Sequence, residues 1–365
     1  MPLKWRQQWV SDEIFESAGV FDVNNDGVLD IVSGAFWYQG PDFRKKHFIG
    51  PVRAEGEYFD DFSTIAVDVN GDGYLDFLTG GWWGNTIRWR ENPKGDPKQT
   101  WTEHVIAETG NVETTRGWDV DSDGLLEIIP NTPPAREVKV FKLKTDANGK
   151  GIGAFDKHVV YEFPDKQGHG LGCGDIAGNG RMDILLNDGW LEAPADPWKG
   201  KWIWHSDFKL GWWASSVPML VVDVNGDGVN DVIVGNAHGY GLMWIEHKRE
   251  GGKHLWINHP IDPHNAQYHD LQWVDIDGDG QKELVTGKRH RAHCGNDVGE
   301  FDDVGVYYFK WNGESFSKQV ISYGPIGTGK GCGIHFAVAD LRGSGRLDIV
   351  APGKDGLRVF ENLGL

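Results

Sequence analysis

One acidic, glycine-centred phrase recurs along the chain and limits the folds that the chain can adopt. Residues 68–81 read DVNGDGYLDFLTGG, and residues 223–236 read DVNGDGVNDVIVGN. The other copies begin at Asp22, Asp119, Asp175, Asp275 and Asp340. The phrase therefore occurs seven times, at intervals of 46 to 65 residues. A repeat of this length indicates a fold built from similar structural units.

The segments between the acidic phrases have the composition of short strands joined by tight turns. The 365 residues include 51 glycines and 16 prolines, with short apolar runs between them. A second element, an aromatic residue followed three positions later by His or Gln, also occurs seven times, as in WTEHVI at 101–106. Its first copy, at Trp5, precedes the first acidic phrase, whereas the chain ends on LRVFEN.

This offset predicts that the N-terminal strand completes the last unit and closes a ring. Four strands per unit and seven units predict an all-β fold, a seven-bladed β-propeller with four-stranded blades. A single domain is expected over residues 1–365, because every unit shares the same pattern.

The acidic phrase has the pattern DxDxDGxxD, with oxygen ligands at positions one, three, five and nine. Calcium binds such hard oxygen ligands. A helical EF-hand is rejected, because strand-like runs such as FLTGG follow the phrase. We predict about five structural calcium sites. Their ligands are Asp22, Asn24, Asp26, Asp30; Asp68, Asn70, Asp72, Asp76; Asp119, Asp121, Asp123, Glu127; Asp223, Asn225, Asp227, Asp231; and Asp275, Asp277, Asp279, Glu283.

The two remaining phrases lack a complete ligand set. The phrase from Asp175 has Ala177 at its third position, and the phrase from Asp340 has Arg342 there. An arginine could replace the cation by pairing with Asp340 and Asp348. Both loops are therefore expected to be free of metal.

The seven acidic loops resemble those of the FG-GAP or VCBS repeat proteins, seven-bladed propellers of the integrin alpha-subunit type, over essentially the whole chain. The resemblance implies that the acidic loop joins the first and second strands of each blade. Two shorter motifs, YHDLQWVDIDGDGQKELVTG at 268–287 and WRENP at 89–93, are similar to the propeller of aldos-2-ulose dehydratase. The single-propeller format is similar to the L-rhamnose-α-1,4-D-glucuronate lyases.

Charge and composition exclude some partners. The formal net charge of −18 argues against a nucleic-acid partner, because basic residues are not clustered enough to follow phosphates. No run of about 18 apolar residues is present, so no membrane span is expected. The compartment stays open: secreted or periplasmic if a leader has been removed, otherwise cytoplasmic. Three cysteines cannot form a disulfide framework.

Some histidines stand at positions where the other repeats carry different residues, and these histidines mark a candidate site. His169 and His269 stand six residues before an acidic loop, and His335 stands five before one. If the loops lie on one rim, these residues lie around the channel at the opposite rim. The segment GKRHRAHCGND at 287–297 belongs to the longest unit and is expected at the same rim. By contrast, the repeated outer-strand histidines are structural: His47, His104, His158, His205 and His259.

The narrower resemblance implies a carbon-oxygen lyase or dehydratase that eliminates across a bond of a uronic-acid glycan or keto-sugar. Such a reaction needs a base, an acid and a group that stabilises negative charge. The catalytic candidates are His269 and His335 as base or acid, Tyr240 as an alternative proton donor, and Arg116, Lys288 and Arg289 facing the negative charge. The substrate-binding candidates are His169, His238, His290, His293, Trp82, Trp83, Trp212, Trp213 and Lys354.

Three alternatives stay open at this point. His169, His269 and His335 could jointly hold one further divalent metal ion in the channel, since three imidazoles suit zinc. The chain could also be a non-catalytic, calcium-stabilised propeller that binds a glycan or a protein. A glycoside hydrolase would need a pair of carboxylates. Its candidates are Glu16, Glu113, Asp60, Asp61 and Asp270.

Overall fold

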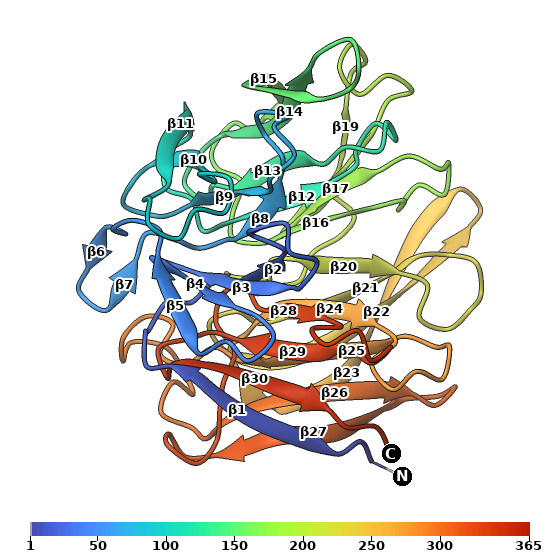
Figure 1. Cartoon of the computed structure of the whole chain (residues 1–365). Coiled ribbons are helices and arrows are strands. Elements are labelled where there is room, and N and C mark those ends of the chain that lie inside the picture. Colours follow the sequence, from blue (N-terminus) through green and yellow to red (C-terminus); the bar gives the residue numbers. More distant parts are fainter. Residues whose placement is uncertain (1) are drawn as a thin grey trace.

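The computed structural model describes residues 2–365, which form strands, turns and loops without a helix (Figure 1). Five sheets have four antiparallel strands each, and an eight-stranded sheet joins two further four-stranded units through the parallel pair β16 and β20. The result is seven four-stranded units, or blades, each with an acidic loop between its first and second strands. The all-β propeller architecture expected from the sequence is confirmed.

The blades follow one another along the chain. Blade 1 contains β2 (Gly19–Phe21), β3 (Asp30–Ser33), β4 (Phe36–Gln39) and β5 (Lys45–Phe48); blade 2 contains β8 (Ile65–Val67), β9 (Asp76–Gly80), β10 (Thr86–Glu91) and β11 (Thr102–Glu108). Blade 3 contains β12 (Thr114–Trp118), β13 (Glu127–Asn131), β14 (Glu137–Thr145) and β15 (Gly151–Glu162); blade 4 contains β16 (Leu171–Gly174), β17 (Asp183–Leu186), β18 (Gly189–Glu192) and β19 (Ile203–His205).

The C-terminal half continues the series. Blade 5 contains β20 (Met219–Val222), β21 (Asp231–Gly235), β22 (Tyr240–Glu250) and β23 (Lys253–Ala266); blade 6 contains β24 (Tyr268–Val274), β25 (Glu283–Lys288), β26 (Val304–Trp311) and β27 (Phe316–Gly324). Blade 7 contains β28 (Ala337–Ala339), β29 (Asp348–Ala351), β30 (Leu357–Asn362) and the N-terminal strand β1 (Trp5–Ser11). A small hairpin of β6 (Ala54–Glu55) and β7 (Tyr58–Phe59) lies between blades 1 and 2.

Strand β1 closes the ring, as the offset between the two repeated elements predicts. It pairs antiparallel with β30, with Trp5 opposite Asn362. The two ends of the chain lie together at one edge of the molecule (Figure 1). Hydrogen bonds join Lys4 to Gly364 and Leu363, at 2.8 Å and 2.9 Å. The described residues contain no helix long and apolar enough to cross a membrane.

The core lies between neighbouring blades. Second strands such as DFLTG of β9 and DVIVG of β21 are buried along their whole length, because other blades cover both faces. Ile129 of blade 3, for example, packs in one cluster with Leu171 and Ile184 of blade 4. Seven such clusters, one between each pair of neighbouring blades, hold the ring together.

The acidic loops turn in the same way in every blade. Gly27 and Gly73, at the sixth position, adopt φ angles of 84° and 89°, which only glycine adopts at little cost. The first aspartate accepts backbone N–H groups, as Asp22 does from Asp26 (3.1 Å) and Gly27 (2.8 Å). These loops occupy one end of the first strands. The segments that enter the first strands therefore lie at the other end, around the channel.

Candidate functional site

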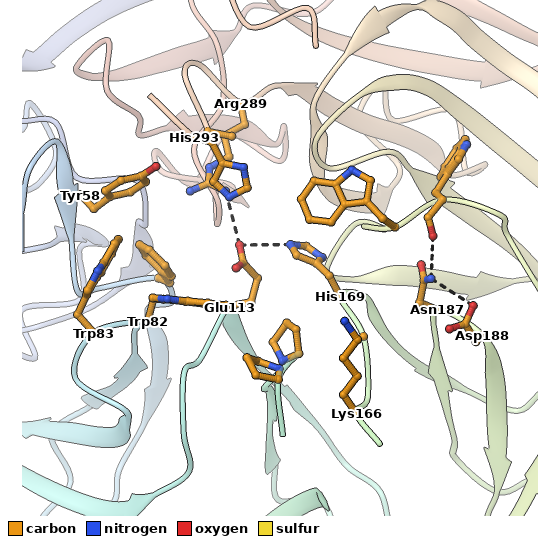
Figure 2. A pocket seen from close by; sticks show the side chains of 17 residues that line it. Tyr58, Trp82, Trp83, Glu113, Lys166, His169, Asn187, Asp188, Arg289 and His293 are labelled. Carbon is orange, nitrogen blue, oxygen red and sulfur yellow. Dashed lines mark hydrogen bonds and ion pairs between the residues drawn. The ribbon is translucent and has the colours of Figure 1, made fainter. Parts of the chain in front are cut away.

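A cavity of about 600 Å³ lies at the channel end opposite the acidic loops (Figure 2). Its walls come from segments that enter first strands and from loops that follow second strands. Position six before the acidic loop contributes to the cavity in three blades, through Phe62, Glu113 and His169. Residues 289–303, the long connection between β25 and β26, add Arg289 and His293. The extra length of the longest unit thus carries part of the site.

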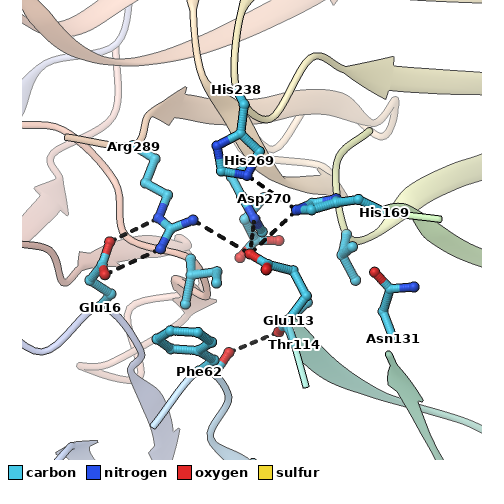
Figure 3. A network of polar contacts seen from close by, with 12 residues as sticks. Glu16, Phe62, Glu113, Thr114, Asn131, His169, His238, His269, Asp270 and Arg289 are labelled. Carbon is cyan, nitrogen blue, oxygen red and sulfur yellow. Dashed lines mark hydrogen bonds and ion pairs between the residues drawn. The ribbon is translucent and has the colours of Figure 1, made fainter. Parts of the chain in front are cut away.

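Four buried side chains from four blades form a cluster: Glu113 and His169, which line the cavity, and His238 and His269, which lie beside them. One ligand atom of each lies within 4.8 Å of all the others. Glu113 Oε1 is 3.3 Å from His169 Nε2 and 3.2 Å from His269 Nε2 (Figure 3). The Nε2 atoms of His169 and His238 are 3.2 Å apart.

The outer nitrogens of two of these rings fix their tautomers. His169 Nδ1 is 2.9 Å from the carbonyl oxygen of Ser215, which can only accept, so Nδ1 carries the hydrogen. His238 Nδ1 is 2.7 Å from Asp297 Oδ2 and donates to that carboxylate in the same way. In the neutral rings both Nε2 atoms therefore carry lone pairs that point at each other. A proton or a metal ion between them is needed to remove this repulsion.

Electrostatics favour neutral imidazoles beside a carboxylate. Burial lowers the pKa of His238 to about 4, although Asp297 opposes this shift. Burial also lowers the pKa of His269 well below its ordinary value. Burial would raise the pKa of Glu113, but His169 and His269 outweigh it and hold the pKa well below the usual range. His269 Nδ1 is buried without a hydrogen-bond partner among residues 2–365.

A cationic wall stands beside the cluster. The Arg289 guanidinium donates to both oxygens of Glu16, at 2.8 Å and 3.3 Å, and its Nη1 lies 3.6 Å from Glu113 Oε1. Lys354 Nζ is 3.6 Å from Glu16 and 4.1 Å from the ring centre of Tyr58. Burial raises the pKa of the Tyr58 phenol, which lines the cavity next to Arg289.

Two tandem tryptophan pairs flank the cavity. Trp82 and Trp83 follow β9, and Trp212 and Trp213 precede β20. Trp213 is 63% exposed and stacks on His238, with ring centres 4.9 Å apart. The sequence expectation that these four indoles lie near the site agrees with their positions. Trp190, in contrast, is fully buried against His205 and belongs to the core.

The structure brings some predicted site residues together and separates others. His169, Arg289 and His293 line the cavity, and His238 and His269 join Glu113 and His169 in the buried cluster. Five of the six catalytic candidates do not line it: His269, which lies in the cluster, and His335, Tyr240, Arg116 and Lys288. The binding candidates His238, His290 and Lys354 do not line it either.

The four catalytic candidates outside both the cavity and the cluster have other contacts. His335 accepts a hydrogen bond from the Thr64 amide (3.0 Å) and lines a second cavity of about 470 Å³ together with Arg116. Arg116 donates to Asp270 at 2.8 Å. Tyr240 donates to Asp302 at 2.6 Å on the outer surface, and Lys288 donates to the Asp302 carbonyl at 2.9 Å.

The three-histidine metal set that the sequence left open as an alternative is therefore not assembled. His335 points away, whereas His238 and Glu113 complete the cluster around His169 and His269. Glu113, Asp297 and Tyr58 were not foreseen in these roles. Glu113 stands six residues before Asp119, the same position as His169 and His269 in their blades. This shared position in the repeat is the sequence signal that could have identified Glu113.

The carboxylates considered for a hydrolase do not form a pair across the cavity. Glu16 is bound by Arg289, Asp60 by Arg88 and Asp270 by Arg116. Of the five candidates only Glu113 lines the cavity. The arrangement suits metal or proton chemistry around one carboxylate, not a two-carboxylate mechanism.

Comparison with known proteins supports the fold. Residues 223–286 match the FG-GAP-like repeat. No curated protein matches the chain by sequence. Among solved structures, the exotype rhamnogalacturonan lyase YesX is similar over 98% of this chain and 73% of its own (TM-score 0.50, 13% identity). The V. cholerae biofilm matrix protein Bap1 is similar over 99% of this chain and 91% of its own (TM-score 0.53, 11% identity).

A third structure extends the comparison to a different protein. Sqt1 of Saccharomyces cerevisiae is similar over 100% of this chain and 99% of its own (TM-score 0.52, 11% identity). Sequence identities this low show only that the chain shares its fold with these proteins. The role of the cavity therefore has to be argued from its own residues.

Proposed function

We propose that the protein is a carbohydrate-active carbon-oxygen lyase or dehydratase whose cavity floor holds one divalent metal ion. The main observation behind the proposal is that the Nε2 lone pairs of His169 and His238 point toward each other beside Glu113. It is supported by the tryptophan pairs, which offer stacking surfaces to sugar rings. Elimination from a uronic-acid glycan or keto-sugar is the reaction implied by the resemblance drawn from the sequence.

The residues present fit a divalent ion. Three imidazoles and one carboxylate are ligands that zinc and related metals take. The Ser215 carbonyl and Asp297 hold the outer nitrogens of His169 and His238, which is the usual outer-shell arrangement of metal-binding histidines. When bound, such an ion would polarise a carbonyl or carboxylate of the sugar and make the neighbouring C–H more acidic.

Other residues can move the protons. His293 Nδ1 lies 2.8 Å from Asp297 Oδ1 and donates to it, so its Nε2 is left as an acceptor at the cavity wall. We assign His293 the role of base that takes the proton next to the acidifying group. Tyr58 keeps its proton at neutral pH, because burial raises its pKa, and would donate it to the departing oxygen.

Arg289 is the fixed cation at the site. Glu16 holds its guanidinium in place through two hydrogen bonds, so it can face negative charge on a sugar without reorganising. Lys166, which also lines the cavity, would add a second positive group at the wall. Together they favour a substrate that carries a carboxylate or develops an enolate.

The test uses the full chain stripped of metal and reloaded with zinc or manganese. Ultraviolet absorbance of the unsaturated product is followed on a panel of uronic-acid glycans and keto-sugars, and bound metal is counted separately. We expect one transition-metal ion per chain and rising absorbance on one substrate class. His238→Ala should lose both, whereas His259→Ala, on the outer strand β23, should lose neither.

Two results would decide against the proposal. A protein that binds no transition metal at micromolar concentration contradicts the metal assignment. Tight glycan binding without any absorbance change favours a non-catalytic binding propeller, which the exposed face of Trp213 would also serve.

A further inference from the structure

Two of the acidic loops enclose a lysine ammonium group. Lys142 Nζ lies 2.6 Å from Asp121, 2.5 Å from Asp123 and 3.0 Å from Glu127. These carboxylates occupy the third, fifth and ninth positions of the blade 3 loop. They are the oxygens that the sequence pattern assigns to calcium.

Blade 6 repeats the arrangement. Lys310 Nζ contacts Asp277 and lies 2.9 Å from Asp279 and 3.6 Å from Glu283. Lys142 follows Phe141, which is opposite Ile128, and Lys310 follows Phe309, which is opposite Leu284. Both lysines therefore hold the same place on the third strand of their blade.

The other blades carry no lysine at this place. The corresponding third-strand residues are Gln39, Glu91, Glu192, Glu246 and Glu361. Three of these glutamates accept from histidines of the outer strand, as in the Glu91–His104 contact of 2.8 Å.

The ninth loop residue changes together with the third-strand residue. It is glutamate only in the two lysine blades, as Glu127 and Glu283, and aspartate in the other five. The longer acid and the lysine thus occur as a pair in both blades.

We propose that Lys142 and Lys310 are built-in cations that take the place of calcium in blades 3 and 6. Calcium needs the same carboxylate oxygens at roughly 2.3–2.6 Å, a position that the ammonium groups already fill. A tethered ammonium gives these turns a permanent counter-charge that chelators cannot remove. The sequence expectation of five calcium loops therefore narrows to the loops that begin at Asp22, Asp68 and Asp223.

Blade 7 uses a related solution. Arg342 donates to the ninth-position Asp348 at 2.7 Å, which is one of the two pairings expected from the sequence. Asp340, the other expected partner, instead accepts the backbone amides of Ser344 (2.9 Å) and Gly345 (2.7 Å). A side-chain cation in one loop of the ring can thus replace the charge of an ion without changing the turn.

Calcium counting on the full chain tests the proposal. Wild type, Lys142→Met and Lys310→Met are equilibrated with calcium, and bound ions are counted by elemental analysis. Each variant should bind one calcium more than wild type, and its melting temperature should become more sensitive to chelator. Lys144→Met is the matched control, because Lys144 lies on the same strand but pairs with Asp156 (2.7 Å) outside the loop.

A reciprocal variant keeps the test decisive if a methionine variant does not fold. Asp76→Glu combined with Glu91→Lys gives the blade 2 loop the lysine arrangement and should remove one bound calcium. Five calcium ions on the wild-type chain, or methionine variants with an unchanged count, would overturn the proposal. The readouts do not use catalysis, so the result is independent of the proposed lyase activity.

Discussion

The Nε2 atoms of His169 and His238 lie 3.2 Å apart, although the Nδ1 atom of each ring is already held by an oxygen acceptor. Two lone pairs at this distance repel each other in a buried site, where water cannot screen them. The contact is stable only with a positive charge between the rings. Glu113 supplies the matching negative charge at 3.3 Å from His169.

Asp297 should control metal affinity without being a ligand. It orients both His238 and His293 through hydrogen bonds of 2.7 Å and 2.8 Å. We expect Asp297→Asn to weaken zinc binding about 10- to 100-fold, because the His238 tautomer is no longer enforced. Competition against a zinc chelator measures the change. Asp302→Asn, in the same long connection but bound to Tyr240, should leave the affinity unchanged.

The two candidate phenols should behave differently. Tyr58→Phe removes the buried proton donor and should lower kcat by about 10²- to 10⁴-fold, with the metal content and the fold intact. Tyr240→Phe, which alters a hydroxyl on the outer surface, should keep nearly full activity. Equal losses in both variants would remove Tyr58 from the proposed mechanism.

Trp213 should contribute to sugar binding and not to stability. Its exposed indole stacks on His238 and lines the cavity. We expect Trp213→Ala to weaken glycan binding about tenfold, which corresponds to about 1.4 kcal/mol. Calorimetric titration with the active glycan measures this. Trp9→Ala is the control, since Trp9 is 53% exposed but lies on β1, at the outer strand of blade 7.

The ion pair between Asp262 and Lys318 should make a pH-dependent contribution to the free energy of unfolding. Burial would raise the pKa of Asp262, but the hydrogen bond from Lys318 (2.6 Å) and others outweigh it and lower the pKa to about 2. Because the pKa of Asp262 is lower in the folded protein, the ion pair stabilises the fold at pH values above about 3.8, the pKa in the unfolded chain. This stabilisation is lost as the pH falls through about 2.

Chemical unfolding at several pH values tests this pair. Lys318→Met should lower the free energy of unfolding by about 1–2 kcal/mol at pH 7. The difference from wild type should shrink as the pH falls from about 4 to about 2. Lys253→Met, an exposed position on the same strand as Asp262, should show no such dependence. A difference that stays constant over this range would show that Lys318 acts through packing alone.

The repeat made the propeller, its closure by β1 and the positions of the acidic loops predictable. Position six before a loop places His169 at the cavity and His269 beside it in the buried cluster. His335 stands five before its loop, and in an extended segment a shift of one residue turns the side chain to the other side. It therefore lies with Arg116 in the second cavity.

The rest depended on contacts between blades. Asp297 reaches His238 from a connection of irregular structure, and Tyr58 comes from a hairpin outside the repeat. The lysines inside two loops could be recognised only once the pairing of third with second strands was known. The repeat predicts the features that recur in every blade, whereas the site is built from residues that do not recur.

Closure of the ring by β1 and β30 joins two strands that lie more than three hundred residues apart along the chain. During translation β1 leaves the ribosome before its partner β30, and more than three hundred residues must be added between them. Until then blade 7 cannot be completed, and its unpaired edge is open to other chains. In the cell, blade 7 should therefore be completed only after β30 has left the ribosome, and products truncated before β30 should be the species that aggregate.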